Sequence, residues 1–236
     1  AYQNQARAYY SADGVVDLDP YLESPRWGLD VASRADFYAA FLQQDRAEGA
    51  QICFPPNRSM EVLFCNLDWL AELGFERPPQ RWEEFAQMCR AASRQPFSRS
   101  ADPRRSLGFL LEIDASRMAS LVFGQGGDLL NAAGDTYTLD TPPIRAALQL
   151  VLQLMREGCV QLLGEEYGDQ REFSVGQVLF ALRSSSSLPF ITSAVQQGGV
   201  GFRWDVAPLP YVGDAPVVNV YGASLAVART TPARQL

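Results

Sequence analysis

The chain has 236 residues, enough for one or two domains, and its 47% hydrophobic and 20% charged residues are typical of a folded globular protein. All 20 basic residues are Arg, and with 27 acidic residues and no His the formal charge is -7. The lack of His and Lys excludes imidazole bases, Ser–His and Cys–His nucleophile pairs, His-ligated metals and Lys Schiff bases. We therefore expect no metal and no cofactor. Scattered Arg residues on an acidic chain also argue against a nucleic-acid partner.

Apolar runs alternate with helical patterns along the chain, which indicates an α/β fold. A strand is predicted over residues 62–64 and another over 107–111. Between them, a helix carries its apolar residues on one face, namely Trp82, Phe85, Cys89 and Ala92. Later strands are predicted over 178–182 and 225–227.

The clearest helical pattern follows Thr141, which is expected to cap the helix, with Pro142 in the first turn and Gly158 at the end. Its apolar stripe is expected to lie in the core and consists of Ile144, Ala147, Leu148, Val151, Leu154 and Met155. Pro-rich breaks lie at residues 54–57 and 208–216. Because proline fixes φ and lacks an N–H, both breaks are poor strands and suit crossovers between two lobes.

The four cysteines have no metal-ligand spacing, and we interpret them as buried apolar residues. A Cys53–Cys65 disulfide stays an alternative in an oxidising compartment. The chain contains no apolar run long enough to span a membrane. It begins AYQNQARAYY, with neither an initiator Met nor the apolar core of a signal peptide, so we expect a piece of a longer protein whose compartment cannot be read from this end.

Several motifs, in order and spacing, resemble the family 1 extracellular solute-binding proteins, the maltose-binding-protein-like receptors of ABC transporters. The early ones are residues 17–22 (DLDPYL), 49–55 (GAQICFP), 62–74 (VLFCNLDWLAELG) and 79–85 (PQRWEEF). The later ones are Gly126, Gly127 and Gly134, the helix with Ala147 and Leu148, residues 173–176 (FSVG) and 205–210 (DVAPLP), and Gly222 with residues 225–227. Arg81 stands where the family usually has a helix-capping Thr.

The resemblance implies a type II periplasmic-binding-protein-like fold, with two α/β lobes joined by hinge crossovers near 55–59 and 211–221. Residues 1–57 and 217–236 would form a partial first lobe, and residues 58–216 the second lobe. The family's chains are longer at both ends, so the first lobe is expected to be incomplete. Solute would bind in the cleft between the lobes.

The resemblance also implies solute-binding residues where the motifs match. They are Asn57, Arg58 and Ser59 on the first crossover, Asp114 and Ser116 after the strand over 107–111, Arg183, Ser185 and Ser186 after the strand over 178–182, and Asn219 and Tyr221 on the return crossover. Amide, carboxylate and guanidinium groups can pair with adjacent hydroxyls, and Tyr offers a stacking face, so the set suits a polyol. The serine run at 184–187 lacks the aromatic platform of many sugar-binding members, which favours a smaller or more polar solute.

The resemblance therefore implies a non-catalytic extracytoplasmic receptor, periplasmic or lipid-anchored, that binds a small polar solute, most simply a sugar, and delivers it to the permease subunits of an ABC transporter. A sensory ectodomain of the same fold is an alternative. Another is a carboxylate-dependent glycoside hydrolase using an acidic pair such as Asp135/Asp140 or Glu165/Glu166. Calorimetric binding with the sugar recovered intact, against turnover of a glycoside, distinguishes the receptor from the hydrolase.

Overall fold

The computed structural model describes residues 1–164 and 167–230, and the contacts within it divide the chain into two compact units. Unit 1 comprises Ala1–Ser59 and Val220–Leu236, and unit 2 comprises Met60–Asn219. The sequence predicts junctions at 57/58 and 216/217, so Arg58, Ser59 and residues 217–219 lie in the opposite unit from the one expected.

Unit 2 is built on a mixed sheet with the strand order β5-β4-β6-β3-β7, and β8 pairs with β3. The strands of this path are β3 (Ser59–Asn66), β4 (Leu107–Leu111), β5 (Val160–Leu162), β6 (Val178–Ser184) and β7 (Trp204–Ala207), while β8 (Val220–Tyr221) consists of residues assigned to unit 1. β4 runs parallel to β5 and β6, whereas β3 is antiparallel to β6 and β7. The runs predicted as strands at 62–64, 107–111 and 178–182 are therefore confirmed.

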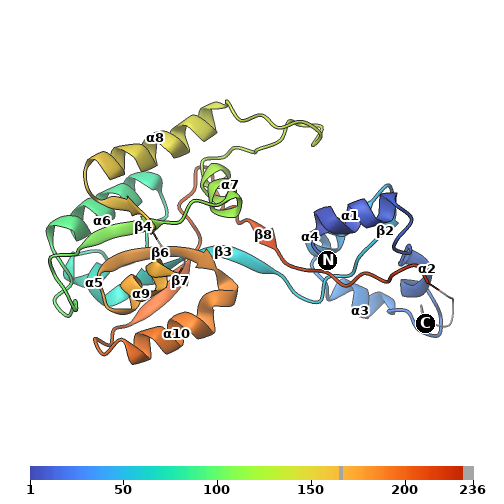
Figure 1. The fold of residues 1–236 in the computed structure, drawn as a ribbon, viewed down its shortest axis with the longest axis horizontal. Helices are drawn as coiled ribbons and strands as arrows, with labels where there is room; N and C mark the ends of the chain where they lie inside the picture. Colours follow the sequence, from blue (N-terminus) through green and yellow to red (C-terminus); the bar gives the residue numbers. More distant parts are fainter. Residues whose placement is uncertain (165–166, 231–236) are drawn as a thin grey trace. The chain divides into compact units, whose positions relative to one another are not determined.

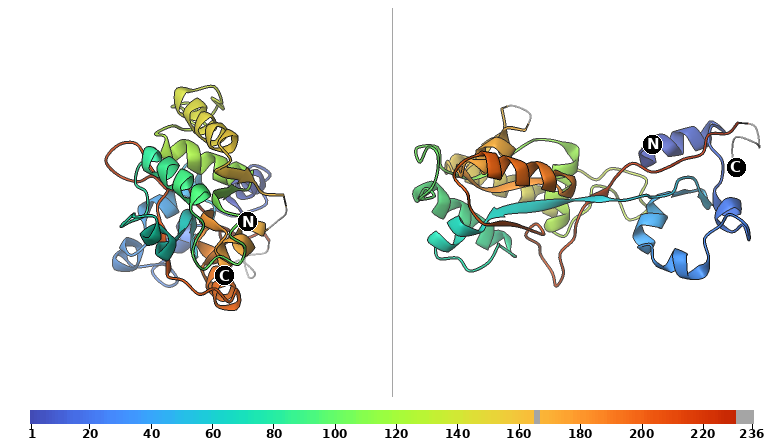
Figure 2. Two further views of the ribbon diagram at one scale, coloured as in Figure 1. Left: turned by 90° about the vertical axis from the view of Figure 1, so that its left-hand side faces the viewer. Right: turned by 90° about the horizontal axis from the view of Figure 1, so that it is seen from below.

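Helices cover both faces of this sheet (Figure 1). They are α5 (Leu67–Glu72), α6 (Trp82–Arg94), α7 (Ala115–Gly124), α8 (Pro142–Arg156), α9 (Gly168–Ser174), the 3-10 turn η1 (Ser185–Ser187) and α10 (Leu188–Gln197). Leu63 and Cys65 of β3 pack in a large cluster with α6, α7 and α8, while Val62 and Phe64 pack with α9 and α10. This alternation is the period of two expected of a strand buried on both sides. Figure 2 shows α8 and α10 on opposite sides of the unit.

Gly108 explains how closely α6 approaches the sheet. A Cβ at this position would lie 2.3 Å from the Cα of Cys89, so only glycine allows the contact. The predicted apolar face of α6 is confirmed, because Trp82, Phe85, Cys89 and Ala92 are all buried. The helix backbone and the strand backbone thus pack without an intervening side chain.

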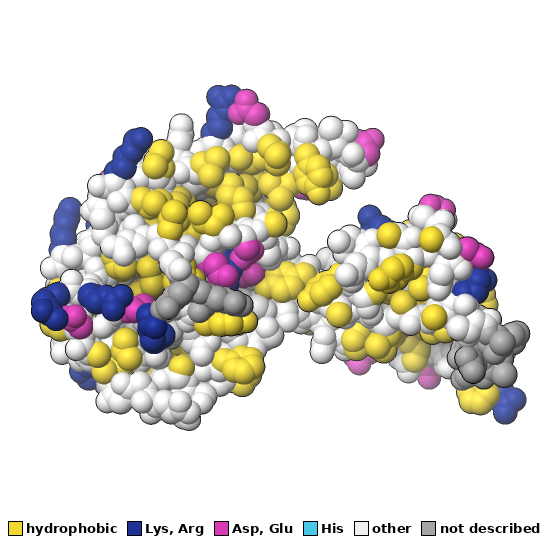
Figure 3. Space-filling model, in the orientation of Figure 1, with side chains coloured by type: hydrophobic (Ala, Val, Ile, Leu, Met, Phe, Trp, Pro, Cys, Tyr) yellow, Lys and Arg dark blue, Asp and Glu magenta, His cyan; other side chains and the backbone are white. Residues whose placement is uncertain are grey.

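α8 begins and ends where predicted, but two details differ. Thr141 makes no side-chain capping hydrogen bond. Pro142 and Pro143 occupy the first two positions and lack N–H groups, so few donors remain for a cap to satisfy. Leu148, predicted in the core, is 53% exposed. Leu148 lines an apolar groove between α8, α7 and the end of β4, and Figure 3 shows hydrophobic side chains gathered on the surface of this part of unit 2.

Unit 1 contains small helices and few strands. Its elements are α1 (Gln3–Ser11), α2 (Asp19–Leu22), α3 (Val31–Ala35), α4 (Ala39–Gln44), β1 (Arg46–Ala47) and β2 (Ala50–Gln51). The predicted strand over 225–227 is wrong. Leu225 and Ala228 make only isolated bridges, to Phe54 and Val15, because no neighbouring described strand of this unit extends the pairing.

The first residues of the proline-rich stretch at 208–216 pack against unit 2 and do not yet cross to another lobe. Leu209 is buried in the large cluster of unit 2. Tyr211 N–H donates to the Gln80 carbonyl at 3.0 Å, and Val212 N–H donates to the Gly124 carbonyl at 2.9 Å. This stretch is therefore anchored on the turn that precedes α6 and on the end of α7.

The four cysteines are buried free thiols, so the prediction of small buried residues is confirmed and the Cys53–Cys65 alternative is not formed in this structure. Burial raises the pKa of the Cys65 and Cys89 thiols well above the usual range. Among the described residues, none of the helices has the length and hydrophobicity that a bilayer crossing requires.

Candidate functional site

One edge of the unit 2 sheet gathers polar side chains. The carboxyl ends of the parallel strands β4 and β6 meet at this edge, and the antiparallel β3 begins there, with Glu61 opposite Ser184. Ligands of open α/β sheets bind outside the carboxyl ends of strands. We name this edge the polar end, and it consists of Glu61, Glu112, Asp114, Ser116, Arg117, Asp169, Arg183, Ser185, Ser186 and Asn219.

Ser116 and Asn219 meet in the polar end, although 103 positions separate them in the chain. The Asn219 side-chain amide donates to the Ser116 hydroxyl at 2.9 Å. The Ser116 hydroxyl in turn donates to the Glu61 carboxylate at 3.3 Å, and Glu61 is buried. Both Ser116 and Asn219 are partly exposed, so this hydrogen-bonded row continues to the surface.

Asp114 caps α7 and holds an arginine at the same time. Its carboxylate accepts the Arg117 N–H at 2.9 Å and pairs with the Arg117 guanidinium. That guanidinium also pairs with Glu112 at 2.8 Å and donates to the Leu182 carbonyl at 2.9 Å. The local sequence explains the geometry, because Asp is a preferred N-cap residue and its partner lies three residues later.

The serine run lies where β6 ends. The Ser185 hydroxyl accepts the Met60 N–H at 3.2 Å, which ties the start of β3 to the end of β6. Ser186 is exposed, and its hydroxyl lies 2.8 Å from that of Ser184. These hydroxyls are small donors and acceptors with no aromatic side chain among them.

The structure changes the role we assign to Arg183. Its guanidinium pairs with Asp169 and donates to the Ser187 hydroxyl, and both charged side chains are almost fully buried. A buried arginine paired in this way supports the fold of the polar end rather than presenting a free fork to a ligand.

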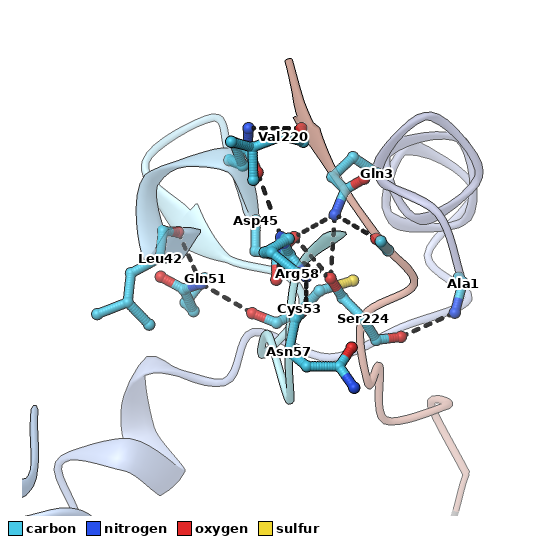
Figure 4. A network of polar contacts seen from close by, with 12 residues as sticks. Ala1, Gln3, Leu42, Asp45, Gln51, Cys53, Asn57, Arg58, Val220 and Ser224 are labelled. Carbon is cyan, nitrogen blue, oxygen red and sulfur yellow. Dashed lines mark hydrogen bonds and ion pairs between the residues drawn. The ribbon is translucent and has the colours of Figure 1, made fainter. Parts of the chain in front are cut away.

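Arg58 of unit 1 is likewise buried and paired with a carboxylate (Figure 4). Its guanidinium lies 2.8 Å from the Asp45 carboxylate, and both side chains have 0% exposure. It also donates to the Ser224 hydroxyl at 3.0 Å and to the Gln44 side chain at 3.2 Å. Arg58 therefore stabilises the fold of unit 1 and does not present its guanidinium to a ligand.

The other predicted residues of unit 1 are more accessible. Asn57 is exposed, while Ser59 and Tyr221 are partly exposed. The carbonyl of Asn57 would lie 3.3 Å from a Cβ at Gly222, so the first crossover and the returning chain run side by side within unit 1.

Sequence reasoning missed three buried carboxylates that organise these clusters, Glu61, Asp45 and Asp169. Glu61 is the one charged residue in the apolar strand β3, and that isolation was a usable signal for a buried polar contact. Asp45 carries no such signal, because it directly follows α4, whose last two residues are polar, and its partner Arg58 lies 13 residues away.

The acidic pairs considered for hydrolysis have little support. Hydrogen bonds from the side chains of Asn131 and, to a smaller extent, Thr136 lower the pKa of the exposed Asp135. The Arg145 guanidinium lowers the pKa of the exposed Asp140. A general acid needs a raised pKa, so neither carboxyl is tuned for that role. Glu165 and Glu166 lie outside the described residues.

Comparison with solved structures identifies the fold. The chain is similar to the sugar-binding protein MalE of Xanthomonas citri, with a TM-score of 0.79, 18% identity, and 99% of this chain covering 57% of that one. It is also similar to the GacH receptor of Streptomyces glaucescens, solved with acarbose (TM-score 0.77, 18% identity, 98% of this chain and 56% of that one). A third is UgpB of Mycobacterium tuberculosis, solved with glycerophosphocholine (TM-score 0.76, 19% identity, 98% and 54%).

These likenesses confirm the predicted α/β fold of the periplasmic-binding-protein type. The chain spans a little over half the length of the structures it matches. No protein-family model matches the sequence, and a search of curated proteins finds no significant match.

Proposed function

We propose that the protein is a non-catalytic receptor that binds a small polar solute, most simply a sugar, and delivers it to the permease of an ABC transporter. The observation that carries the proposal is the polar end, where a serine, an asparagine and carboxylates converge at the carboxyl ends of strands on a fold shared with solute receptors. Amide and carboxylate groups of this kind pair with adjacent hydroxyls of a sugar.

Within this proposal, Ser116, Asn219 and the carboxylate of Asp114 contact the solute from unit 2, with Ser185 and Ser186 beside them. From unit 1, Asn57 and Ser59 supply hydrogen bonds and Tyr221 a stacking face, as proposed from the sequence. Arg58 and Arg183 hold the surrounding structure through Asp45 and Asp169.

The proposal includes an extracytoplasmic location and no catalysis. Its support is the fold shared with solute-binding proteins, together with the lowered pKa of Asp135 and Asp140, which suits neither carboxyl to act as a general acid. In the same proposal, the solute binds between two lobes and the loaded receptor docks on permease subunits.

Isothermal titration calorimetry with a panel of neutral mono- and disaccharides tests it. We expect one sugar to bind with a Kd of about 1 μM or below, roughly -8 kcal/mol, and to be recovered intact. Asn219→Ala, which removes the amide from the polar end, should weaken that binding, while the exposed Gln197→Ala on α10 should not. Release of product from a glycoside, or absence of binding by every sugar, would reject the receptor.

A further inference from the structure

The polar end carries more negative than positive charge. Its four carboxylates are Glu61, Glu112, Asp114 and Asp169, and its two guanidiniums are Arg117 and Arg183. The net formal charge of these six groups is therefore -2.

Two of these carboxylates face solvent, whereas Glu61 and Asp169 are buried. The side chains of Glu112 and Asp114 are 31% and 37% exposed, whereas that of Arg117 behind them is 10% exposed. Arg183 is similarly enclosed by Asp169 and Ser187. Recognition of phosphate or carboxylate depends on guanidinium forks that are free to bind it, and both forks here are committed to protein carboxylates.

The N-termini of the helices at this edge do not replace a free cation as a site for an anion. The Asp114 carboxylate already occupies the start of α7. At the start of α10, the Leu188 N–H donates to the Ser185 carbonyl, and the next residue is Pro189, which has no N–H. At these two helix starts, the Asp114 cap, the hydrogen bond of the Leu188 N–H and the proline therefore leave fewer backbone donors for an anion.

The groups left for a ligand are hydroxyls, an amide and carboxylate oxygens. The Ser185 and Ser186 hydroxyls can donate and accept, and the Asn219 side-chain carbonyl and the carboxylates accept from hydroxyls, whereas the Ser116 hydroxyl already donates to Glu61 and the Asn219 amide already donates to Ser116. A phosphorylated solute brings a charge of about -1.5 to -2 at pH 7 and would meet Glu112 and Asp114 first.

We infer that the polar end selects uncharged polyhydroxylated solutes and rejects their phosphorylated or carboxylated counterparts. This inference rests on the proposed receptor function and narrows its class of substrate.

The test compares matched pairs by calorimetry at low salt: glucose with glucose 6-phosphate, galactose with galactose 6-phosphate, and glucose with glucuronate, together with maltose and glycerol 3-phosphate. We expect a neutral sugar to bind and its anionic counterpart to bind at least tenfold more weakly. An anionic probe that binds as tightly as its neutral counterpart, or that alone binds, overturns the inference and leaves the receptor function standing. Absence of binding by all probes overturns the receptor function, and the inference with it.

A charge variant tests the physical cause. Glu112→Gln removes one solvent-facing carboxylate beside Arg117, and we expect the ratio of neutral to anionic affinity to fall about threefold to tenfold. Glu83→Gln on α6 makes the same change in net charge at an exposed position outside the polar end, and it should leave the ratio unchanged. Equal shifts in both variants, or no shift in Glu112→Gln, would contradict the role of the polar end.

Discussion

The side chains of Arg58 and Asp45 form the most enclosed ion pair of unit 1, with neither side chain exposed. Removing one member of a buried pair leaves an uncompensated charge away from water, and this cost exceeds the attraction lost. The hydrogen bonds of Arg58 to Gln44 and Ser224 add to the effect. The pair therefore contributes strongly to the free energy of unfolding of unit 1.

We expect Arg58→Ala to lower the free energy of unfolding of unit 1 by about 3–5 kcal/mol, measured by urea denaturation. Arg229→Ala is the matched control, because Arg229 pairs with Asp13 in the same unit but both side chains are largely exposed. The control should cost at most about 1 kcal/mol. Equal losses in the two variants would contradict a buried structural role for Arg58.

Glu84 caps α6 from inside the helix. Its carboxylate accepts the Arg77 guanidinium and the N–H groups of Gln80 and Arg81, which together lower its pKa to about 2. It thereby compensates for Arg81, whose side chain makes no capping hydrogen bond where the family usually has Thr. This is half of a capping box.

The stabilisation by Glu84 is expected to depend on pH. Because the folded pKa lies below the ordinary value of 4.5, the stabilisation is fully present above about pH 5 and is lost as pH falls from 4.5 toward 2. Glu84→Gln should cost about 1 kcal/mol at pH 7, with the difference from the parent protein shrinking through that window. Glu83→Gln, on the next residue, serves as control in the same denaturation series. A difference that stays constant down to pH 2 would refute the ionic cap.

At the scale of elements, α8 buries only part of its apolar surface. Leu154 lies in the large cluster with 1% exposure, whereas Leu152 is 46% exposed on the other side of the helix. An apolar groove of about 340 Å³ runs along that outer side, between α8, α7 and the end of β4. The stripe read from the sequence is therefore wider than the face that the helix buries.

The two leucines give a matched pair for this conclusion. Leu154→Ala should destabilise unit 2 by about 2–5 kcal/mol, because it leaves a cavity in the core. Leu152→Ala changes the same atoms at an exposed site and should stay within about 0.5 kcal/mol. Denaturation midpoints compare them directly. A large loss for Leu152→Ala would mean that its side of α8 is covered in solution.

At the scale of the whole molecule, the two units differ in the size of their cores. Among the residues that the structure describes, the buried apolar cluster of unit 1 has four members, Ala6, Ala50, Ile52 and Cys53, while unit 2 buries two clusters, one on each side of its sheet. Stability grows with the apolar surface that folding buries, so unit 1 is expected to open first.

The four buried thiols can report this order. In pulsed thiol labelling over a urea series, with each site read by peptide mass, we expect Cys53 to react at lower urea than Cys65, Cys89 and Cys159. None should react rapidly in the native protein, because burial protects all four. Fully denatured protein gives the reference of complete labelling. A single midpoint shared by all four sites would show that the units unfold together.

Composition and local pattern predict three strands of unit 2 (β3, β4 and β6), two of its helices (α6 and α8), and an order of segments that resembles a solute receptor. These features depend on composition and on spacing between near neighbours, as in the alternation of residues 62–65 and the apolar face of α6. Such patterns are local and can be read without knowing the fold.

Which polar groups stay free for a ligand depends on contacts between residues that are far apart in the chain. Arg58 and Arg183 read as binding residues, yet each is enclosed by a carboxylate that local patterns do not select. The meeting of Ser116 with Asn219 depends on strand order and on chain returning from far away. Likewise, the exposure of Leu148 depends on which elements cover α8, because burial is a property of neighbours in space rather than of neighbours in the chain.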